Sequence, residues 1–259
     1  MILTQREYEW LLAHLNTVED IPTIADEKSW SYDSILSIWS QKEKTMHIIA
    51  TKAHRKQIKR YAIRLQAGVE SILQLASRLN YPSKDLARLF LQDVCTSKQL
   101  VRSYLKNPVS IPTEHAWLQP HVLSAIAADT RGRVQTDIVR RVMGEEYEYV
   151  LERQLRKAGL AFIDEQKLMD QGFSKTPDVL LVIPFAVKGQ EVNWIDSKAM
   201  FGSKELHRQH LHTQLQPYVN RYGPGLVIYW FGFVADNAAL DPDVCVLDRF
   251  PTEIVQLTT

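Results

Sequence analysis

A change in the spacing of apolar residues along the chain most constrains its fold. In the first half, apolar residues recur every three or four positions, as at Leu11 and Leu15, which predicts amphipathic helices. In the second half, apolar runs have the length of strands; these runs are Val179–Val187, Val192–Ile195 and Leu226–Val234. We therefore predict an α/β protein, with a helical amino-terminal region followed by a mixed sheet flanked by helices.

The two halves also differ in charge. Residues 1–143 carry 20 basic and 14 acidic residues, a net charge of +6, whereas residues 144–259 carry 11 and 16, a net charge of −5. Prolines 108, 112 and 120 interrupt the chain between the helical and strand-rich parts. We predict one region at 1–120 and a second domain at 121–259. A basic region beside an acidic one suits nucleic-acid binding, although ordinary surface variation is the alternative.

Basic residues in the first region are candidates for contacts with phosphate. Lys56 and Lys59 lie in a run of cations between residues 52 and 64, which is either a nucleic-acid contact or a solvated helix face. Residues 69–94 then resemble two short helices around a turn, with Ser83 as the expected cap of the second. Such a helix-turn-helix-like unit would present Lys84 and Arg88 from its second helix. Many helical hairpins bind no nucleic acid, so this pattern is weak.

The strongest chemical pattern lies on two neighbouring predicted strands. Asp196 and Lys198 are two residues apart, so in a strand they share a face, with Ser197 on the other. Asp178 precedes the strand that a tight turn at 188–190 would pair with theirs. Two close carboxylates repel each other unless they share a proton or a cation, and oxygen ligands favour Mg²⁺ or Mn²⁺. The alternative is that Asp196 and Lys198 form a surface ion pair.

Pro177-Asp178 and Asp196-Ser197-Lys198 together resemble the motifs of the PD-(D/E)xK nuclease superfamily, which includes Holliday-junction resolvases and RecB-type nucleases. Its core helix carries a glutamate, for which Glu148 is the first candidate and Glu146 the competitor. Gln214 and Tyr218 match the Q-x-x-x-Y motif of RecB-type members. Within this superfamily, residues 172–233 and the opening MILTQREY are similar to the codanin-1-interacting nuclease family.

This resemblance implies a Mg²⁺- or Mn²⁺-dependent deoxyribonuclease at 121–259 that acts on branched, flapped or single-stranded DNA. Metal ligands would be Asp178, Asp196, Glu148 and the backbone carbonyl of Ser197, while Lys198 would assist catalysis. Gln214 and Tyr218 would contact the nucleic acid. The resemblance also implies codanin-1 as a partner, a nuclear location that can extend to the cytoplasm, and, as in resolvases, a homodimer. An adaptor that binds codanin-1 and nucleic acid without cleaving it is the alternative.

Other residues have weaker claims to function. His207 and His210 lie on the predicted helix of Gln214, where His207 could contact a substrate phosphate or face solvent. Their spacing and the lack of a nearby cysteine argue against zinc. The aromatic run at 229–233 is expected to belong to the core. No apolar run approaches the roughly 18 to 20 residues of a membrane span, so no membrane association is expected.

Overall fold

The computed structural model describes residues 1–95, 97–129 and 133–256. It divides into two compact units: Met1–Lys42 with Asp137–Thr259, and Glu43–Thr136. These units differ from a division at residue 120, because the first 42 residues pack with the carboxyl-terminal part of the chain. No helix within the described ranges is long and apolar enough to cross a membrane.

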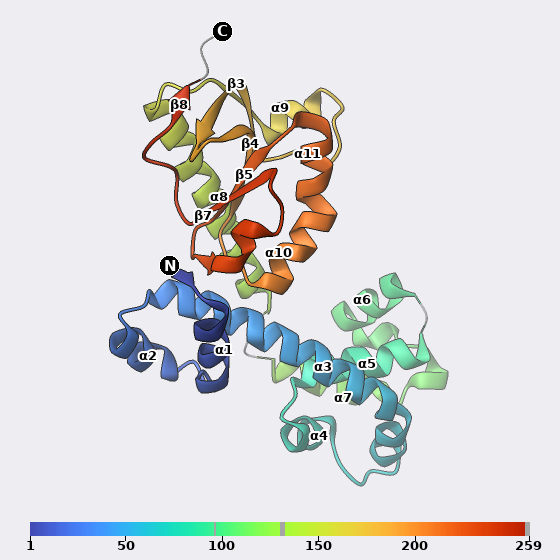
Figure 1. Ribbon diagram of the computed structural model, residues 1–259. Coiled ribbons are helices and arrows are strands. Elements are labelled where there is room, and N and C mark those ends of the chain that lie inside the picture. The colour runs from blue at the N-terminus through green and yellow to red at the C-terminus, as the bar shows by residue number, and fades with distance from the viewer. Residues whose placement is uncertain (96, 130–132, 257–259) are drawn as a thin grey trace. The chain divides into compact units, whose positions relative to one another are not determined.

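A mixed sheet forms the centre of the larger unit (Figure 1). Its strands are β2 (Phe162–Asp164), β3 (Val179–Val187), β4 (Gln190–Lys198), β5 (Gly225–Tyr229) and β7 (Val244–Leu247), in that order, with β8 (Val255–Gln256) paired to β3. The pairs β2–β3 and β3–β4 are antiparallel, whereas β4–β5 and β5–β7 are parallel. The predicted α/β class with a mixed central sheet is confirmed.

The β3–β4 hairpin fixes where the chemical motifs meet. Lys188 and Gly189 form its two-residue turn, and both have positive φ values, 52° and 80°, as a tight turn between twisted strands requires. Val179 pairs with Ile195 and Leu180 with Trp194. A register shift follows between Leu180 and Phe185, so an irregularity separates the turn from the end of the hairpin that carries the motifs.

Helices cover both faces of the sheet. Leu151 and Leu155 of α8 (Arg133–Lys157) pack on one face with β3, β4 and β5. Leu215 and Tyr218 pack on the other face, against Trp194. These two residues belong to a continuous helical segment of α10 (Lys204–His210), the π-helical turn η3 (Leu211–Leu215) and α11 (Gln216–Tyr222). Pro217 has no N–H for the helix ladder, and the irregular turn lies just before it.

The amino-terminal 42 residues complete the core of this unit. The short strand β1 (Ile2–Leu3) pairs in parallel with β6 (Phe233–Val234), and α1 (Gln5–His14), α2 (Asp20–Lys28) and the start of α3 (Tyr32–Gln66) follow. Leu11 and Ile35 pack in one cluster with Phe201 and Phe231.

The prediction of one continuous strand over Leu226–Val234 is wrong. The chain turns between β5 and β6 at Gly232, whose φ is 95°. A Cβ at this glycine would lie 1.7 Å from the Met1 carbonyl oxygen, so only glycine fits there. The expectation that the aromatic residues of this run are core is confirmed for Tyr229, Phe231 and Phe233, which are all buried. A 3₁₀ helix, η4 (Ala235–Ala239), follows β6.

The smaller unit is helical. It contains the rest of α3, with α4 (Ile72–Leu79), α5 (Ser83–Val94), α6 (Lys98–Lys106) and α7 (Leu118–Ala127), and the 3₁₀ turns η1 (Pro108–Ser110) and η2 (Thr113–His115). The two predicted helices around residues 80–82 are confirmed as α4 and α5. The predicted capping role of Ser83 is wrong: Pro82 occupies the cap position, and the Ser83 hydroxyl donates instead to the Ala125 carbonyl.

Candidate active site

Two aspartates face each other where β3 and β4 meet. Because Val179 pairs with Ile195, one further step in this antiparallel register brings Asp178 opposite Asp196. Side chains directly opposite in such a pair have Cβ atoms about 4.5–5.5 Å apart. The Asp178 carboxylate is held by the backbone N–H of Ser197, which donates to it at 2.6 Å. The hairpin thus brings together two carboxylates that are 18 residues apart in the sequence.

Lys198 lies beside this pair. Its Nζ is 2.6 Å from Oδ2 of Asp196, and the two side chains are only 15% and 2% exposed. This short contact joins the ammonium group and the carboxylate in a largely buried ion pair. Burial lowers the pKa of Lys198, but the Asp196 and Asp178 carboxylates outweigh this effect and raise it, so the ammonium form is stabilised.

The negative charge at this point exceeds what Lys198 neutralises. Burial, followed by repulsion from Asp196, raises the pKa of Asp178 well above its ordinary value. Two carboxylates this close, with Lys198 balancing one of the two negative charges, suit a hard divalent cation such as Mg²⁺ or Mn²⁺. The residues therefore fit such an ion, although no group of three or more His, Cys, Asp or Glu in the described ranges is already arranged to hold one.

Glu148 of α8 belongs to the same electrostatic environment. Partial burial, followed by the carboxylates of Glu165 and Glu145, raises the pKa of Glu148. Asp196 raises it further by a smaller amount, and Lys198 lowers it. Of the two glutamates that the sequence left open, both are exposed, and Glu148 is the one that interacts electrostatically with Asp178 and Asp196. Glu146 acts on the neighbouring Tyr147. This difference favours Glu148 as the helix carboxylate.

The sequence analysis missed Glu165. This residue begins α9 (Glu165–Asp170), directly after β2, and its backbone N–H donates to the Asp178 carbonyl at 3.1 Å. The Thr176 hydroxyl donates to its carboxylate at 3.3 Å. The sequence did offer a sign of the helix that Glu165 begins: the Asp164 side chain caps α9, and aspartate is common at this position.

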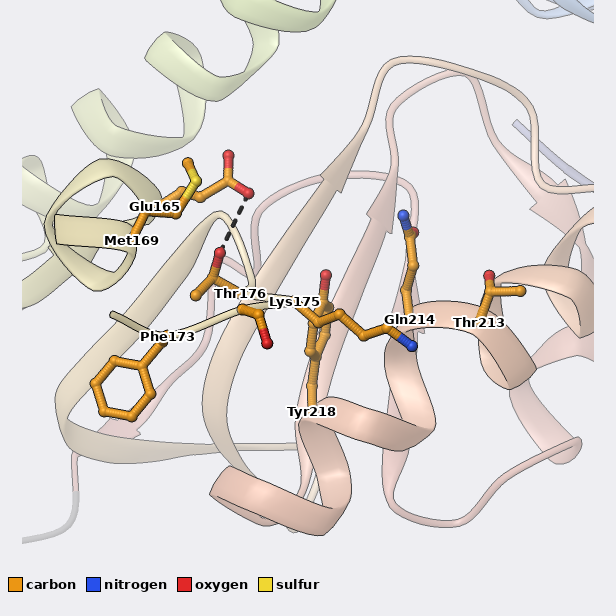
Figure 2. A pocket seen from close by; sticks show the side chains of 9 residues that line it. Glu165, Met169, Phe173, Lys175, Thr176, Thr213, Gln214 and Tyr218 are labelled. Carbon is orange, nitrogen blue, oxygen red and sulfur yellow. Dashed lines mark hydrogen bonds between the residues drawn. The ribbon is translucent and has the colours of Figure 1, made fainter. Parts of the chain in front are cut away.

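Gln214 and Tyr218 line a pocket of about 370 Å³ (Figure 2). Thr176, two residues before Asp178, also lines it. Tyr218 is 4% exposed and its ring packs edge-on against Trp194, 5.3 Å between centroids. Burial, followed by Asp196 and Asp178, raises its pKa, which indicates that the phenol lies near both carboxylates. The Gln214 amide oxygen is buried and has no hydrogen-bond partner in the described parts of the chain.

His207 does not occupy the surface position predicted for it. Its side chain is fully buried, and its Nδ1 lies 3.0 Å from the Tyr229 hydroxyl, which His210 Nδ1 also approaches at 2.9 Å. Burial lowers the pKa of both histidines to about 4, so both rings are neutral near pH 7. The prediction of a phosphate contact is corrected, because a neutral, enclosed imidazole cannot reach a substrate backbone.

The predicted cations of the first region have two different environments. Lys56 and Lys59 are exposed on α3. Lys84 instead pairs with Asp129 at 2.7 Å, and Arg88 pairs with Asp85 at 3.1 Å. The second helix of the helix-turn-helix-like pair therefore directs its two predicted contact residues into ion pairs within its own unit.

Comparison with known proteins places these residues in a family. A family model described as "Protein of unknown function TPD sequence-motif" matches residues 114–250, a range that includes the consecutive Thr176, Pro177 and Asp178. CDAN1-interacting nuclease 1 of Mus musculus and of Homo sapiens are each 34% identical to this chain over 99% of its length and 98% of theirs. The chain belongs to the CDAN1-interacting nuclease 1 family. The relative from Gallus gallus is 31% identical over 99% of this chain and 97% of its own. No solved structure matches significantly.

Membership of this family explains why the resemblance extends beyond the aspartates. The aligned length covers both the helical unit and the sheet-containing unit, so relatives share the whole chain rather than an isolated motif. The names of these relatives describe them as nucleases that interact with CDAN1. The aspartate pair at the end of β3 and β4 is the part of this family member whose chemistry suits a nuclease.

Proposed function

We propose that this protein is a metal-dependent nuclease of the PD-(D/E)xK type that hydrolyses phosphodiester bonds of DNA. The observation that carries the proposal is the placement of Asp178 opposite Asp196, with Lys198 at 2.6 Å from the latter. Burial and repulsion from Asp196 raise the pKa of Asp178, and a perturbed carboxyl group beside a second carboxylate and a lysine is typical of a site that carries out chemistry. Family membership with proteins named nucleases supports the same conclusion.

The proposed roles follow from the positions of the side chains. Asp178, Asp196, Glu148 and the Ser197 carbonyl would hold Mg²⁺ or Mn²⁺, which when bound neutralises phosphate charge and makes water a better nucleophile. Lys198 remains charged because of its carboxylate neighbours, so its ammonium group can donate to a phosphate oxygen that gains charge in the transition state. The Ser197 N–H orients the Asp178 carboxylate.

Cleavage assays with labelled branched, flapped and single-stranded DNA test this proposal. The wild-type protein with Mg²⁺ or Mn²⁺ should cut at least one of these, while Asp196→Ala and Lys198→Ala should not. The matched controls are Asp236→Ala and Lys204→Ala, which remove the partners of a more exposed ion pair at 3.0 Å in the same unit. Cleavage that persists in Asp196→Ala and Lys198→Ala would contradict the proposed site.

Branched, flapped or single-stranded DNA is the proposed substrate, and codanin-1 is the proposed partner, because the relatives are named for interaction with CDAN1. We extend the proposal to a nuclear location, shared with the cytoplasm, and to a homodimer. Co-precipitation of codanin-1 with the tagged full-length chain tests the partner. Sedimentation of the purified protein tests the dimer.

A second candidate is an adaptor that binds codanin-1 and nucleic acid without cleaving it. One observation favours it: the relatives are named for an interaction with CDAN1 as well as for nuclease activity. Calorimetric titration with Mn²⁺ separates the candidates. Binding that is lost in Asp178→Asn and Asp196→Asn supports the nuclease, and absence of binding in the presence of DNA supports the adaptor.

A further inference from the structure

The pocket that Gln214 and Tyr218 line contains side chains suited to binding a ligand. Glu165 and Met169 of α9, the loop residues Phe173 and Lys175, and Gln214 are among the side chains that line it (Figure 2). Its volume of about 370 Å³ lies within the roughly 300–1,000 Å³ typical of small-ligand pockets. The pocket combines an apolar side, a cation and an unpaired acceptor.

These three features match the parts of one nucleotide. Phe173 and Met169 are 42% and 45% exposed and offer an apolar surface for a base. Lys175 is exposed and offers a positive charge for a phosphate. The buried Gln214 amide oxygen accepts no hydrogen bond within the described residues, so a donor from a base or sugar would satisfy it.

The local backbone holds the loop residues in place. Lys175 has a φ of 53°, a left-handed conformation that is uncommon for a residue with a side chain. Arg221 of α11 donates to the Ser174 carbonyl at 2.9 Å, and its guanidinium lies 5.8 Å from the Phe173 ring centre. Arg221 therefore ties the loop to α11 at Phe173 and Ser174, the part of the loop that would contact a base.

Two of the residues that line the pocket lie close to the aspartates. Thr176, which lines it, is two residues before Asp178, so their Cα atoms are at most about 7 Å apart. Tyr218 also lines it and is influenced by both Asp178 and Asp196. A nucleotide in the pocket would thus be a near neighbour of a phosphate bound at the carboxylates.

We infer that this pocket binds one unpaired nucleotide of a DNA strand, next to the phosphate that is cut. Phe173 stacks on its base, Lys175 contacts its phosphate, and Gln214 accepts a hydrogen bond from it. A base that is still paired and stacked in a duplex cannot present its face to Phe173, so the pocket selects single-stranded or frayed DNA. This inference rests on the proposed nuclease function and specifies the form of its substrate.

Fluorescence anisotropy of a labelled single-stranded DNA oligonucleotide and of the matching blunt duplex, in metal-free buffer, tests the inference without requiring cleavage. Phe173→Ala and Lys175→Gln should each weaken single-strand binding about tenfold, and Phe173→Tyr, which keeps the ring, should bind as the wild type does. Lys157→Gln removes an exposed cation of α8 that does not line the pocket and is the matched control for charge.

Three outcomes would overturn the inference. Unchanged single-strand binding in both Phe173→Ala and Lys175→Gln would remove the pocket as a nucleotide site. An equal loss for the duplex would remove its preference for unpaired nucleotides, and an equal loss in Lys157→Gln would reduce the effect to general charge. Failure of the nuclease function has a different signature, because the binding differences would remain while the protein cleaves nothing.

Discussion

The sheet-containing unit and the helical unit handle their charged residues differently. In the helical unit, Lys84 and Arg88 are each neutralised by an aspartate of the same unit. Where β3 and β4 meet, Lys198 pairs with Asp196, yet burial and the repulsion from Asp196 still raise the pKa of Asp178. An excess of charge in a sequence therefore does not identify a functional surface. Buried charge that the fold leaves incompletely neutralised is the better guide.

The largest effect expected from this comparison is on cleavage. Asp178→Asn and Asp196→Asn should each reduce the rate of metal-dependent cleavage by about 10³-fold or more, because stabilisation of phosphate charge by a metal contributes several kcal/mol. Single-turnover cleavage rates at saturating protein measure the effect. The control Asp236→Asn should retain the wild-type rate. A wild-type cleavage rate in either Asp178→Asn or Asp196→Asn would show that incompletely neutralised buried charge does not mark the catalytic site.

A smaller loss of activity is expected when Lys198 is changed. Lys198→Ala should lower the cleavage rate by about 10²–10³-fold, the typical effect of removing one donor to transition-state charge. The affinity for DNA should change much less, because the interaction of Lys198 with the phosphate oxygen strengthens only as negative charge develops in the transition state. Parallel measurement of the dissociation constant and the single-turnover rate checks this. A loss confined to binding would make Lys198 an ordinary phosphate contact.

The repulsion between Asp178 and Asp196 should also make the stability of the folded protein depend on pH. Because the folded-state pKa of Asp178 is raised above 3.8, the folded protein holds this proton more tightly than the unfolded chain does. Its contribution to stability is therefore lost as pH rises from about 3.8 through the folded-state pKa. Asp178→Asn should raise the melting temperature of the metal-free protein at neutral pH by about 2–4 °C, the shift that 1 kcal/mol produces.

This stability gain should shrink as pH falls toward 3.8, since the wild-type aspartate is then protonated as well. Thermal unfolding followed by circular dichroism across this pH range provides the measurement. A gain that stays constant with pH would indicate a packing effect of asparagine instead of relief of repulsion.

The smallest effects are expected in the helical unit. Replacing both exposed residues, Lys56→Gln with Lys59→Gln, should reduce the slope of log affinity against log salt by about 2 if each contacts a phosphate. Lys84→Gln should change DNA affinity little and cost about 1 kcal/mol of stability or less through its ion pair with Asp129. Salt titrations of DNA binding and thermal melts separate the two. A larger loss of DNA affinity in Lys84→Gln than in the Lys56→Gln, Lys59→Gln double variant would make Lys84 the phosphate contact instead.

Local patterns in the sequence predicted much of the site. The turn at residues 188–189 and the two-residue spacing of Asp196 and Lys198 predicted that the three charged side chains lie at the same end of one hairpin. The pairing of Asp178 with Asp196 was not predictable from the turn, because the register shifts between Leu180 and Phe185. The carboxyl-terminal part of helix α8, from about Glu145, was also predictable, since Leu151 and Leu155 recur at helical spacing and Gly159 follows. Its start at Arg133 was not predicted.

Features that depend on distant contacts were not predictable in the same way. Glu165 comes near Asp178 only because β2 pairs with β3, and β2 is too short to be recognised by its pattern. His207 was assigned to the face of Gln214 and Tyr218 on the assumption of a regular α-helix. The π-helical turn between them adds a residue to the turn, so regular spacing does not carry across it.

The parallel pairing of β1 with β6 has a practical consequence for work on isolated pieces of this protein. A fragment that starts near residue 121 would lack Leu11, Leu15 and Ile35, and would leave Phe201, Phe231 and Val234 uncovered. Apolar surface of that kind promotes self-association. A soluble catalytic fragment would need residues 1–42 supplied again, either joined through a linker in place of the helical unit or added as a separate chain.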